Sequence, residues 1–185
     1  QTILLAALAS AGARLDAQAP VDRTAALLAP IIESVSSARL ESTVRALVGF
    51  GTRHTLSDTL SPARGIGAAR RWVRTEFERL SRECGGCLEV LDVAEVFEGL
   101  PRVPGPTNVV SIVAIQRGTT DPDRFVLLSG DLDSRVSDIM NAVDSSPGAN
   151  DNASGVAAVL EAARVLSARR FRGSIVYAAL SGEEN

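Results

Sequence analysis

The sequence predicts an α/β fold of three layers, with helices on both faces of a mostly parallel mixed sheet and a helical segment in front of it. Apolar runs at 109–115, 125–128 and 174–180 are interrupted by a strongly apolar helical stretch at 155–168. Strand and helix alternating in this way is typical of an α/β sheet. Of the 185 residues, 45% are hydrophobic, which is enough for a packed core and excludes global disorder.

Upstream of this alternation, apolar spacing predicts helical and extended segments that pack on the core. We expect helices over 21–50 and 61–82, a strand over 88–97, and loops over 52–61 and 99–106. Within the alternation, we expect a long polar loop over 129–152. Pro30 should break the first helix, because proline removes a backbone donor from a helix interior. Ser61 and Pro62 should begin the second helix, as its N-cap and its first residue.

The N-terminal region has features of an export signal. Residues 3–13 are almost wholly apolar but too few to span a bilayer. Ala17–Gln18–Ala19 then has the small-x-small pattern of a signal-peptidase site, and Pro20 follows it. An ordinary buried helix is the alternative. We expect a secreted or periplasmic protein that has no membrane span after signal removal.

The two ends of the sequence indicate a fragment. The first residue is Gln1 rather than methionine, and the last residues, 181–185, directly follow a predicted buried strand. A sheet that ended there would have an uncovered edge.

Charge and cysteine content restrict the function further. The net charge of −3 argues against a nucleic-acid partner, because phosphate recognition needs a dense basic patch. Cys84 and Cys87 have the spacing of a metal knuckle, but the second cysteine pair that such a site needs is missing. In an exported protein we expect them to form a local disulfide that closes a helix-to-strand turn; two inert thiols are the alternative.

Acidic residues follow the predicted strands and precede the last helix. Ligands of open α/β sheets bind beyond the carboxyl ends of the strands. Five carboxylates are expected at that rim: Asp131, Asp133, Asp151, Glu183 and Glu184. Glycines frame them, at positions 130, 148, 155 and 182. So many like charges repel one another unless a cation neutralises them, so the pattern favours a divalent metal site.

Each of these acids also has a purely structural interpretation. Asp151 could cap the following helix, although Ser154 could do so equally well. Asp133 could pair with Arg135. Glu183 and Glu184 could be the solvated end of a strand.

The stretch 108–185 resembles the secreted zinc aminopeptidases of peptidase family M28. The matching blocks are SGDLDSR (129–135), PGANDNASGVAAVLEAARVLS (147–167) and SGEEN (181–185). The segments GFGTRHTLSD (49–58) and GIGAARRWV (65–73) also resemble the leader part of bacterial members. The resemblance implies three parts: a signal-peptide remnant (1–19), a helical and strand segment on the core (20–106), and the first part of a truncated peptidase domain (107–185).

The resemblance also implies roles for the acids in a site with two zinc ions. Asp131 stands where the family has a zinc-binding histidine, Asp151 would bridge the two ions, and Glu184 would bind one of them. Glu183 would be the general base toward the attacking water, and Asp133 would be the acid behind the first ligand. Two further family ligands, an Asp and a His, follow the Glu-Glu pair and lie beyond residue 185.

The aspartate at position 131 is a departure from the family pattern. It is shorter than histidine and adds a negative charge, which would weaken zinc binding, favour a harder ion such as manganese, or abolish one site. The role of Asp133 is also affected, because an acid orients another acid only if one of them is protonated. His54 lies far upstream in a predicted loop, and we do not expect it to be a ligand.

The resemblance implies release of N-terminal amino acids from a peptide or protein substrate. Three alternatives stay open: a carboxypeptidase or a glutaminyl cyclase with the same site, a binding domain that has lost its metal, and a sugar transferase with an Asp-x-Asp triplet at 131–133. We expect the fragment alone to be inactive, because it can supply only Asp131, Asp151 and Glu184 as ligands.

Overall fold

The computed structural model describes residues 19–185, with side-chain environments from residue 25 onward. The chain divides into two compact units, residues 1–33 and 34–185. The described part of the first unit is helix α1 (Ala19–Glu33). Pro30 lies inside α1, so the predicted break at Pro30 is wrong; proline removes one backbone hydrogen bond, and the helix continues past it to Glu33. The predicted signal segment lies outside the described residues, apart from Ala19.

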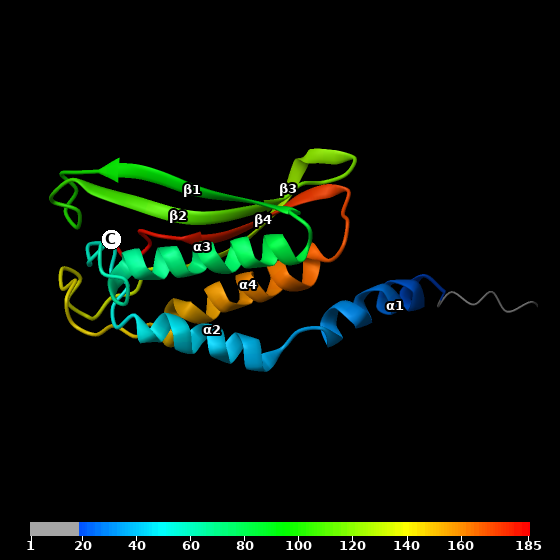
Figure 1. The fold of residues 1–185 in the computed structure, drawn as a ribbon, viewed down its shortest axis with the longest axis horizontal. Helices are drawn as coiled ribbons and strands as arrows, with labels where there is room; N and C mark the ends of the chain where they lie inside the picture. The colour runs from blue at the N-terminus through cyan, green and yellow to red at the C-terminus, as the bar shows by residue number, and fades with distance from the viewer. Residues whose placement is uncertain (1–18) are drawn as a thin grey trace, which may run out of the picture. The chain divides into compact units, whose positions relative to one another are not determined.

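The second unit is built on a four-stranded sheet (Figure 1). Its strands are β1 (Leu88–Phe97), β2 (Thr107–Gln116), β3 (Asp121–Asp131) and β4 (Gly173–Leu180), in the spatial order β1-β2-β4-β3. β1 pairs with β2 and β2 with β4 in antiparallel fashion, whereas β3 and β4 are parallel. The described sheet is therefore mixed, as predicted, and two of the three pairings between its described strands are antiparallel. Parallel neighbours need a long crossover, and β3 and β4 are the neighbours joined by a helical crossover.

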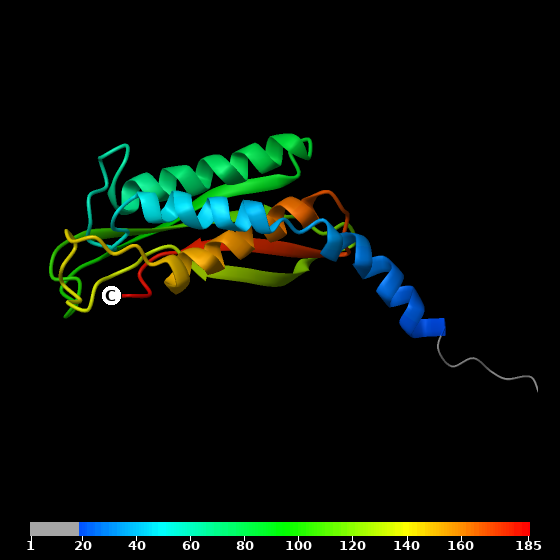
Figure 2. The same ribbon diagram turned by 90° about the horizontal axis from the view of Figure 1, so that it is seen from below.

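Helices cover one face of this sheet (Figures 1 and 2). α3 (Gly65–Glu83) and α4 (Ser154–Ser167) pack on the strands, and α2 (Ser37–Gly49) packs on α4. On β1 and β3 several apolar side chains stay exposed, among them Val93, Val96, Phe125 and Leu127. The α/β class is confirmed. Of the three predicted layers, the described residues form the sheet and one helix layer.

A side-chain cap marks the start of α2, whereas α3 begins at a glycine without one. The hydroxyl of Ser36 accepts the Arg39 N–H at 3.3 Å and caps α2. The predicted start of α3 at Ser61 and Pro62 is wrong by a few residues. Ser61 Oγ instead accepts the N–H groups of Ala63 and Arg64, closing a turn ahead of the helix. α3 begins at Gly65. Its φ is +81°, a backbone conformation that glycine adopts without the steric strain that a side chain would cause.

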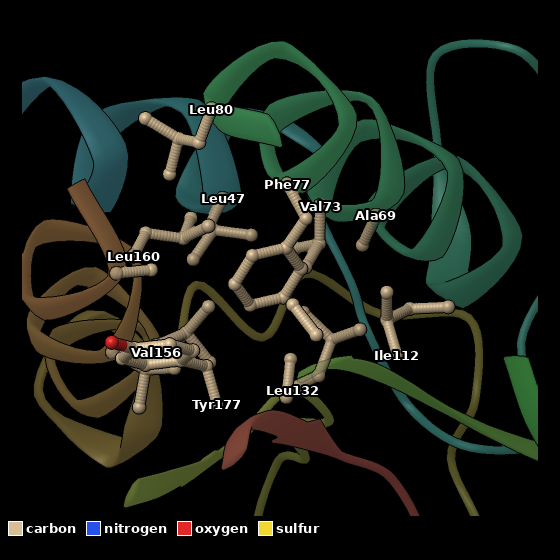
Figure 3. Close-up of a cluster of buried hydrophobic side chains, with 14 of the residues drawn as sticks. Leu47, Ala69, Val73, Phe77, Leu80, Ile112, Leu132, Val156, Leu160 and Tyr177 are labelled. Atoms are coloured by element: carbon tan, nitrogen blue, oxygen red, sulfur yellow. The ribbon is translucent and has the colours of Figure 1, made fainter. Parts of the chain in front are cut away.

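The core lies between the helices and the sheet. Phe77 and Val73 of α3 are fully buried. They face side chains from the other layers, including Leu47 of α2, Val156 of α4 and Ile112 of β2 (Figure 3). Burial of this apolar surface is the main force that holds the layers together. None of the described helices is both long and apolar enough to cross a bilayer.

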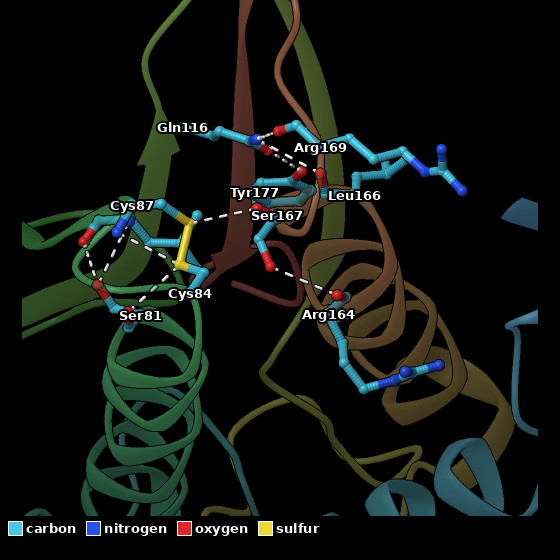
Figure 4. Close-up of a disulfide and its surroundings, with 10 residues drawn as sticks. Ser81, Cys84, Cys87, Gln116, Arg164, Leu166, Ser167, Arg169 and Tyr177 are labelled. Atoms are coloured by element: carbon cyan, nitrogen blue, oxygen red, sulfur yellow. Dashed lines mark hydrogen bonds between the residues drawn. A yellow bond between two sulfur atoms is a disulfide. The ribbon is translucent and has the colours of Figure 1, made fainter.

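The turn from α3 to β1 carries the predicted disulfide. Cys84 and Cys87 are bonded to each other, so this prediction is confirmed (Figure 4). Gly85 and Gly86 between them both have positive φ, of 76° and 85°, which glycine adopts without strain. Ser81 Oγ donates to Leu88 O at 2.7 Å and joins the end of the helix to the start of the strand.

Candidate active site

The parallel pair β3 and β4 brings the predicted acids to one rim of the sheet. Asp131 lies opposite Leu180 in the register, so the residues that follow both strands leave the sheet at the same end. Gly130 allows the start of α4 to approach, since a Cβ at this position would lie 2.5 Å from the carbonyl carbon of Gly155. This contact brings the segment before α4, which carries Asp151, next to the end of β3.

The five carboxylates interact electrostatically. Burial raises the pKa of Asp131, and the charges of Asp133 and Asp151 raise it further. Partial desolvation raises the pKa of Glu183, and so do the other four acids, Glu184, Asp131, Asp133 and Asp151. The structure therefore gathers all five predicted acids into one field of negative charge.

Asp133 is the buried member of this group, with 1% of its surface exposed. Its Oδ2 accepts hydrogen bonds from Thr55 Oγ1 at 2.9 Å and from the backbone N–H of Glu184 at 3.1 Å. Its Oδ1 is buried and has no hydrogen-bond partner among the described residues. A buried carboxylate oxygen without a partner is costly, so a cation or a donor at this position would stabilise the site.

Asp151 lies in a short turn, η1 (Ala149–Ala153), directly before α4. Its side chain is exposed, and its peptide bond to Asn152 is cis. α4 has no side-chain cap, and Ser154 Oγ donates to Asn150 O at 2.7 Å. Neither Asp151 nor Ser154 is used as an N-cap, so the structural interpretation of Asp151 fails.

The two glutamates follow β4 and differ in their surroundings. Gly182 turns the chain with a φ of +93° just before them. Glu183 is exposed. Glu184 is mostly buried and pairs with Arg135, whose Nε lies 2.6 Å from Glu184 Oε2. Arg135 therefore neutralises Glu184 rather than Asp133, which corrects the pairing considered from the sequence.

The donor set suits a hard divalent cation, since all of its side chains offer carboxylate oxygens. The unpaired Oδ1 of Asp133 and the raised pKa values of Asp131 and Glu183 fit a site that a positive charge would complete. In the described part of the chain, no three histidine, cysteine or acidic side chains already converge on one point. Glu184 would have to exchange Arg135 for the ion.

The first part of the loop predicted over 52–61, residues 52–57, is largely buried against the rim. Thr55 donates to Asp133, and Arg53 is 1% exposed. His54 is fully buried; its Nδ1 accepts the Leu56 N–H, and its Nε2 lies 3.0 Å from Ile139 O. Both ring nitrogens thus have backbone partners, in accord with the expectation that His54 is not a ligand. Periodicity gives no signal for Arg53 and Thr55, because polar side chains in a loop look alike whether buried or exposed.

Comparison with known proteins identifies the family. The sequence profile of Peptidase family M28 matches residues 109–185. Residues 109–185 belong to peptidase family M28. This stretch of M28 sequence contains all five rim acids, whereas Arg53 and Thr55 lie upstream of it.

Curated relatives align with more of the chain than the profile does. A probable zinc metalloprotease of Pyricularia oryzae is 46% identical over 150 residues, which are 81% of this chain and 30% of that protein. One of Leptosphaeria maculans is 42% identical over 154 residues, 83% of this chain and 36% of that protein. The chain spans about a third of the length of the curated relatives it matches.

Solved structures share the fold at low sequence identity. The Legionella pneumophila LapA aminopeptidase has a TM-score of 0.62 at 17% identity, covering 100% of this chain and 44% of that one. A glutaminyl cyclase of Porphyromonas gingivalis has a TM-score of 0.61 at 21% identity, covering 82% of this chain and 47% of that one. The M28-type fold is therefore common to enzymes with different reactions.

Proposed function

We propose that this chain supplies part of the active site of an exported, zinc-dependent aminopeptidase with two metal ions. The observation that carries the proposal is the rim itself: five carboxylates in one field, with a buried and unpartnered oxygen on Asp133. Membership of family M28 and the names of the relatives, probable zinc metalloproteases, support metal-dependent peptide hydrolysis. The apolar run at 3–13 and the Cys84–Cys87 disulfide support export to a secreted or periplasmic location.

Asp131, Asp151 and Glu184 are the side chains of this chain that would hold the metal. A bound divalent ion would polarise the scissile carbonyl and lower the pKa of the attacking water. Because Asp131 offers oxygen where the family pattern has a nitrogen donor, we expect a stronger preference for manganese over zinc than in a histidine-containing site.

Glu183 is placed to act as the general base. It is exposed at the rim, and its raised pKa moves it toward the range in which a carboxylate can take a proton and later give it back. It would accept the proton of the attacking water and pass it to the leaving amine. Glu184 is held by Arg135 and by its own backbone bond to Asp133, so the two neighbouring glutamates have different roles.

The role of Asp133 is to hold the backbone that carries Glu184. Its Oδ2 fixes the N–H of Glu184 and receives the hydroxyl of Thr55. It therefore sets the position of the chain after β4 and does not need to orient Asp131 directly, which two ionised acids would not favour.

The test is metal binding followed by a substrate panel, on the full-length protein. Metal-free protein is titrated with Zn²⁺ and Mn²⁺ by calorimetry and then assayed on peptides with a free N-terminus, an acetylated N-terminus or an N-terminal glutamine. Hydrolysis that requires a free α-amino group supports the aminopeptidase. Cyclisation of N-terminal glutamine, or cleavage of acetylated peptides from the C-terminus, would indicate the cyclase or the carboxypeptidase instead. Absence of metal binding would indicate a non-catalytic domain.

A further inference from the structure

Arg53 connects three separate segments around the rim. Its Nε donates to Leu132 O at 2.7 Å. Its Nη1 donates to Leu47 O at 3.1 Å and to Pro147 O at 2.9 Å, and its Nη2 donates to Gly148 O at 3.0 Å. One buried guanidinium therefore binds four backbone carbonyls, from the end of α2, the end of β3 and the approach to η1.

Two of these segments carry the acids proposed to bind metal. Leu132 stands between Asp131 and Asp133, and Gly148 directly precedes the turn that contains Asp151. The guanidinium thus joins the backbone on both sides of the proposed site, and within the described part of the chain its hydrogen bonds all go to backbone carbonyls.

The main chain of the same loop reinforces this connection. The Arg53 N–H donates to Ser134 Oγ at 3.2 Å, and Ser134 Oγ donates to Ser146 O at 2.8 Å. Ser146 Oγ in turn bonds to Thr52 Oγ1 at 3.0 Å. These hydrogen bonds form a buried network that connects residues 52 and 53 with Ser134 and Ser146.

The position is specific for arginine. Its planar fork satisfies four acceptors in different directions, whereas a lysine ammonium has three donors at a single point. Burial lowers the pKa of Arg53 to about 10, so it stays charged at neutral pH. The packing is tight, because a Cβ on Gly148 would lie 2.8 Å from Arg53 Nη2.

We propose that Arg53 is a positioning residue that sets the separation of Asp131 and Asp133 from Asp151 and so preorganises the metal site. This inference rests on the proposed function and extends it to a residue outside the part of the chain matched by the M28 profile. Supporting contacts around metal ligands typically change metal affinity by about 10–100-fold when removed.

The test compares Arg53→Lys with Arg71→Lys in the full-length protein. Arg71 is a matched control, since its guanidinium also binds loop carbonyls, those of Thr59 and Ser61, but it is exposed. We expect R53K to weaken Mn²⁺ affinity by about 10–100-fold in calorimetry, and amide hydrogen exchange to accelerate at 131–134 and 147–153. R71K should stay within about twofold of the wild type, because it leaves the rim untouched. In substrate assays of R53K, kcat should fall with little change in KM.

The outcomes separate this inference from the proposed function. A wild-type protein that binds neither Zn²⁺ nor Mn²⁺ would overturn the proposed function. A wild-type protein that binds metal, together with a folded R53K of equal affinity, would overturn the positioning role alone. If R53K does not fold, Arg53→Gln decides, because the shorter amide keeps a planar donor but cannot reach all four carbonyls. R53Q should weaken Mn²⁺ affinity by about 10–100-fold, and a folded R53Q of unchanged affinity would contradict the proposal.

Discussion

Negative charge at the rim is only partly balanced by the protein's own arginines. Arg53 and Arg70 are both buried, and both lie within electrostatic reach of Asp133. Burial lowers the pKa of each, while the charge of Asp133 raises it. Neither donates a hydrogen bond to Asp133 Oδ1, which stays without a partner in the described structure. Net negative charge therefore remains at the rim, as the proposed metal site requires.

The base role of Glu183 gives a first prediction. Replacing Glu183 with Gln should keep metal binding, because the residue is not among the proposed ligands, and should lower kcat by about 10²–10⁴-fold, as for loss of a general base. Steady-state kinetics and calorimetry on the full-length protein measure both effects. Glu89→Gln is the control, since Glu89 is exposed near the start of β1 and pairs with Ile115, at the end of the sheet opposite the rim. A fully active E183Q enzyme would exclude the assignment.

The Thr55–Asp133 hydrogen bond gives a second prediction. Thr55→Val removes a buried donor from a carboxylate that already has one unpaired oxygen, so it should lower the free energy of unfolding by about 1–3 kcal/mol. Thr75→Val is the matched control: its hydroxyl bonds to Arg71 O on the exposed side of α3, and the loss should stay below about 0.5 kcal/mol. Urea unfolding compares the two. Equal losses would show that the buried Thr55–Asp133 bond contributes no more to the free energy of unfolding than an exposed hydrogen bond.

Among the elements, β1 and α4 were predicted within one residue at each end, whereas β3 is longer than the predicted 125–128 and α3 begins later than predicted. The strand over 88–97 agrees with β1 at both ends, because alternation and the flanking loop mark it clearly. α3 begins later than predicted, because Ser61 caps a turn and the left-handed Gly65 then redirects the chain. The helix-to-strand turn at Cys84 and Cys87 was predicted correctly, because Gly85 ends the helical pattern and two cysteines so close in sequence can form a local disulfide.

This turn gives a third prediction. Replacing Cys84 and Cys87 together with Ser should lower the free energy of unfolding by about 2 kcal/mol, the entropy expected for so short a closed loop. Dithiothreitol should produce the same loss in the wild type and none in the double variant, with urea unfolding as the measurement. A reductant effect of similar size in both proteins would mean that the stabilisation does not come from this bond.

In the unit formed by residues 34–185, helices α2, α3 and α4 share one hydrophobic core with one face of the sheet. The order of the strands was not predicted from the sequence, because it depends on contacts between distant segments, and β4 inserts between β2 and β3. The same insertion makes β3 and β4 parallel neighbours and gathers the acids that follow them. The topology therefore creates the site.

A fourth prediction tests this coupling. Phe77 of α3 is fully buried in the core, so Phe77→Ala should lower the free energy of unfolding by about 3–5 kcal/mol through lost burial and the cavity left behind. Phe125→Ala is the control, because Phe125 is 63% exposed on β3, and its loss should be below about 1 kcal/mol. Thermal and urea unfolding measure both. Similar losses would mean that the exposed face of β3 is covered in the full-length protein.

Local pattern and residue type were enough to predict the α/β class, the approximate positions of the strands, the disulfide and the acids that follow β3 and β4. Long-range packing is what buries residues 52–55, pairs Arg135 with Glu184 and lets Arg53 hold both acid-bearing segments. These contacts join residues 49 to 95 positions apart. Local periodicity carries no information about such pairs, since they arise only when packing has brought the segments together.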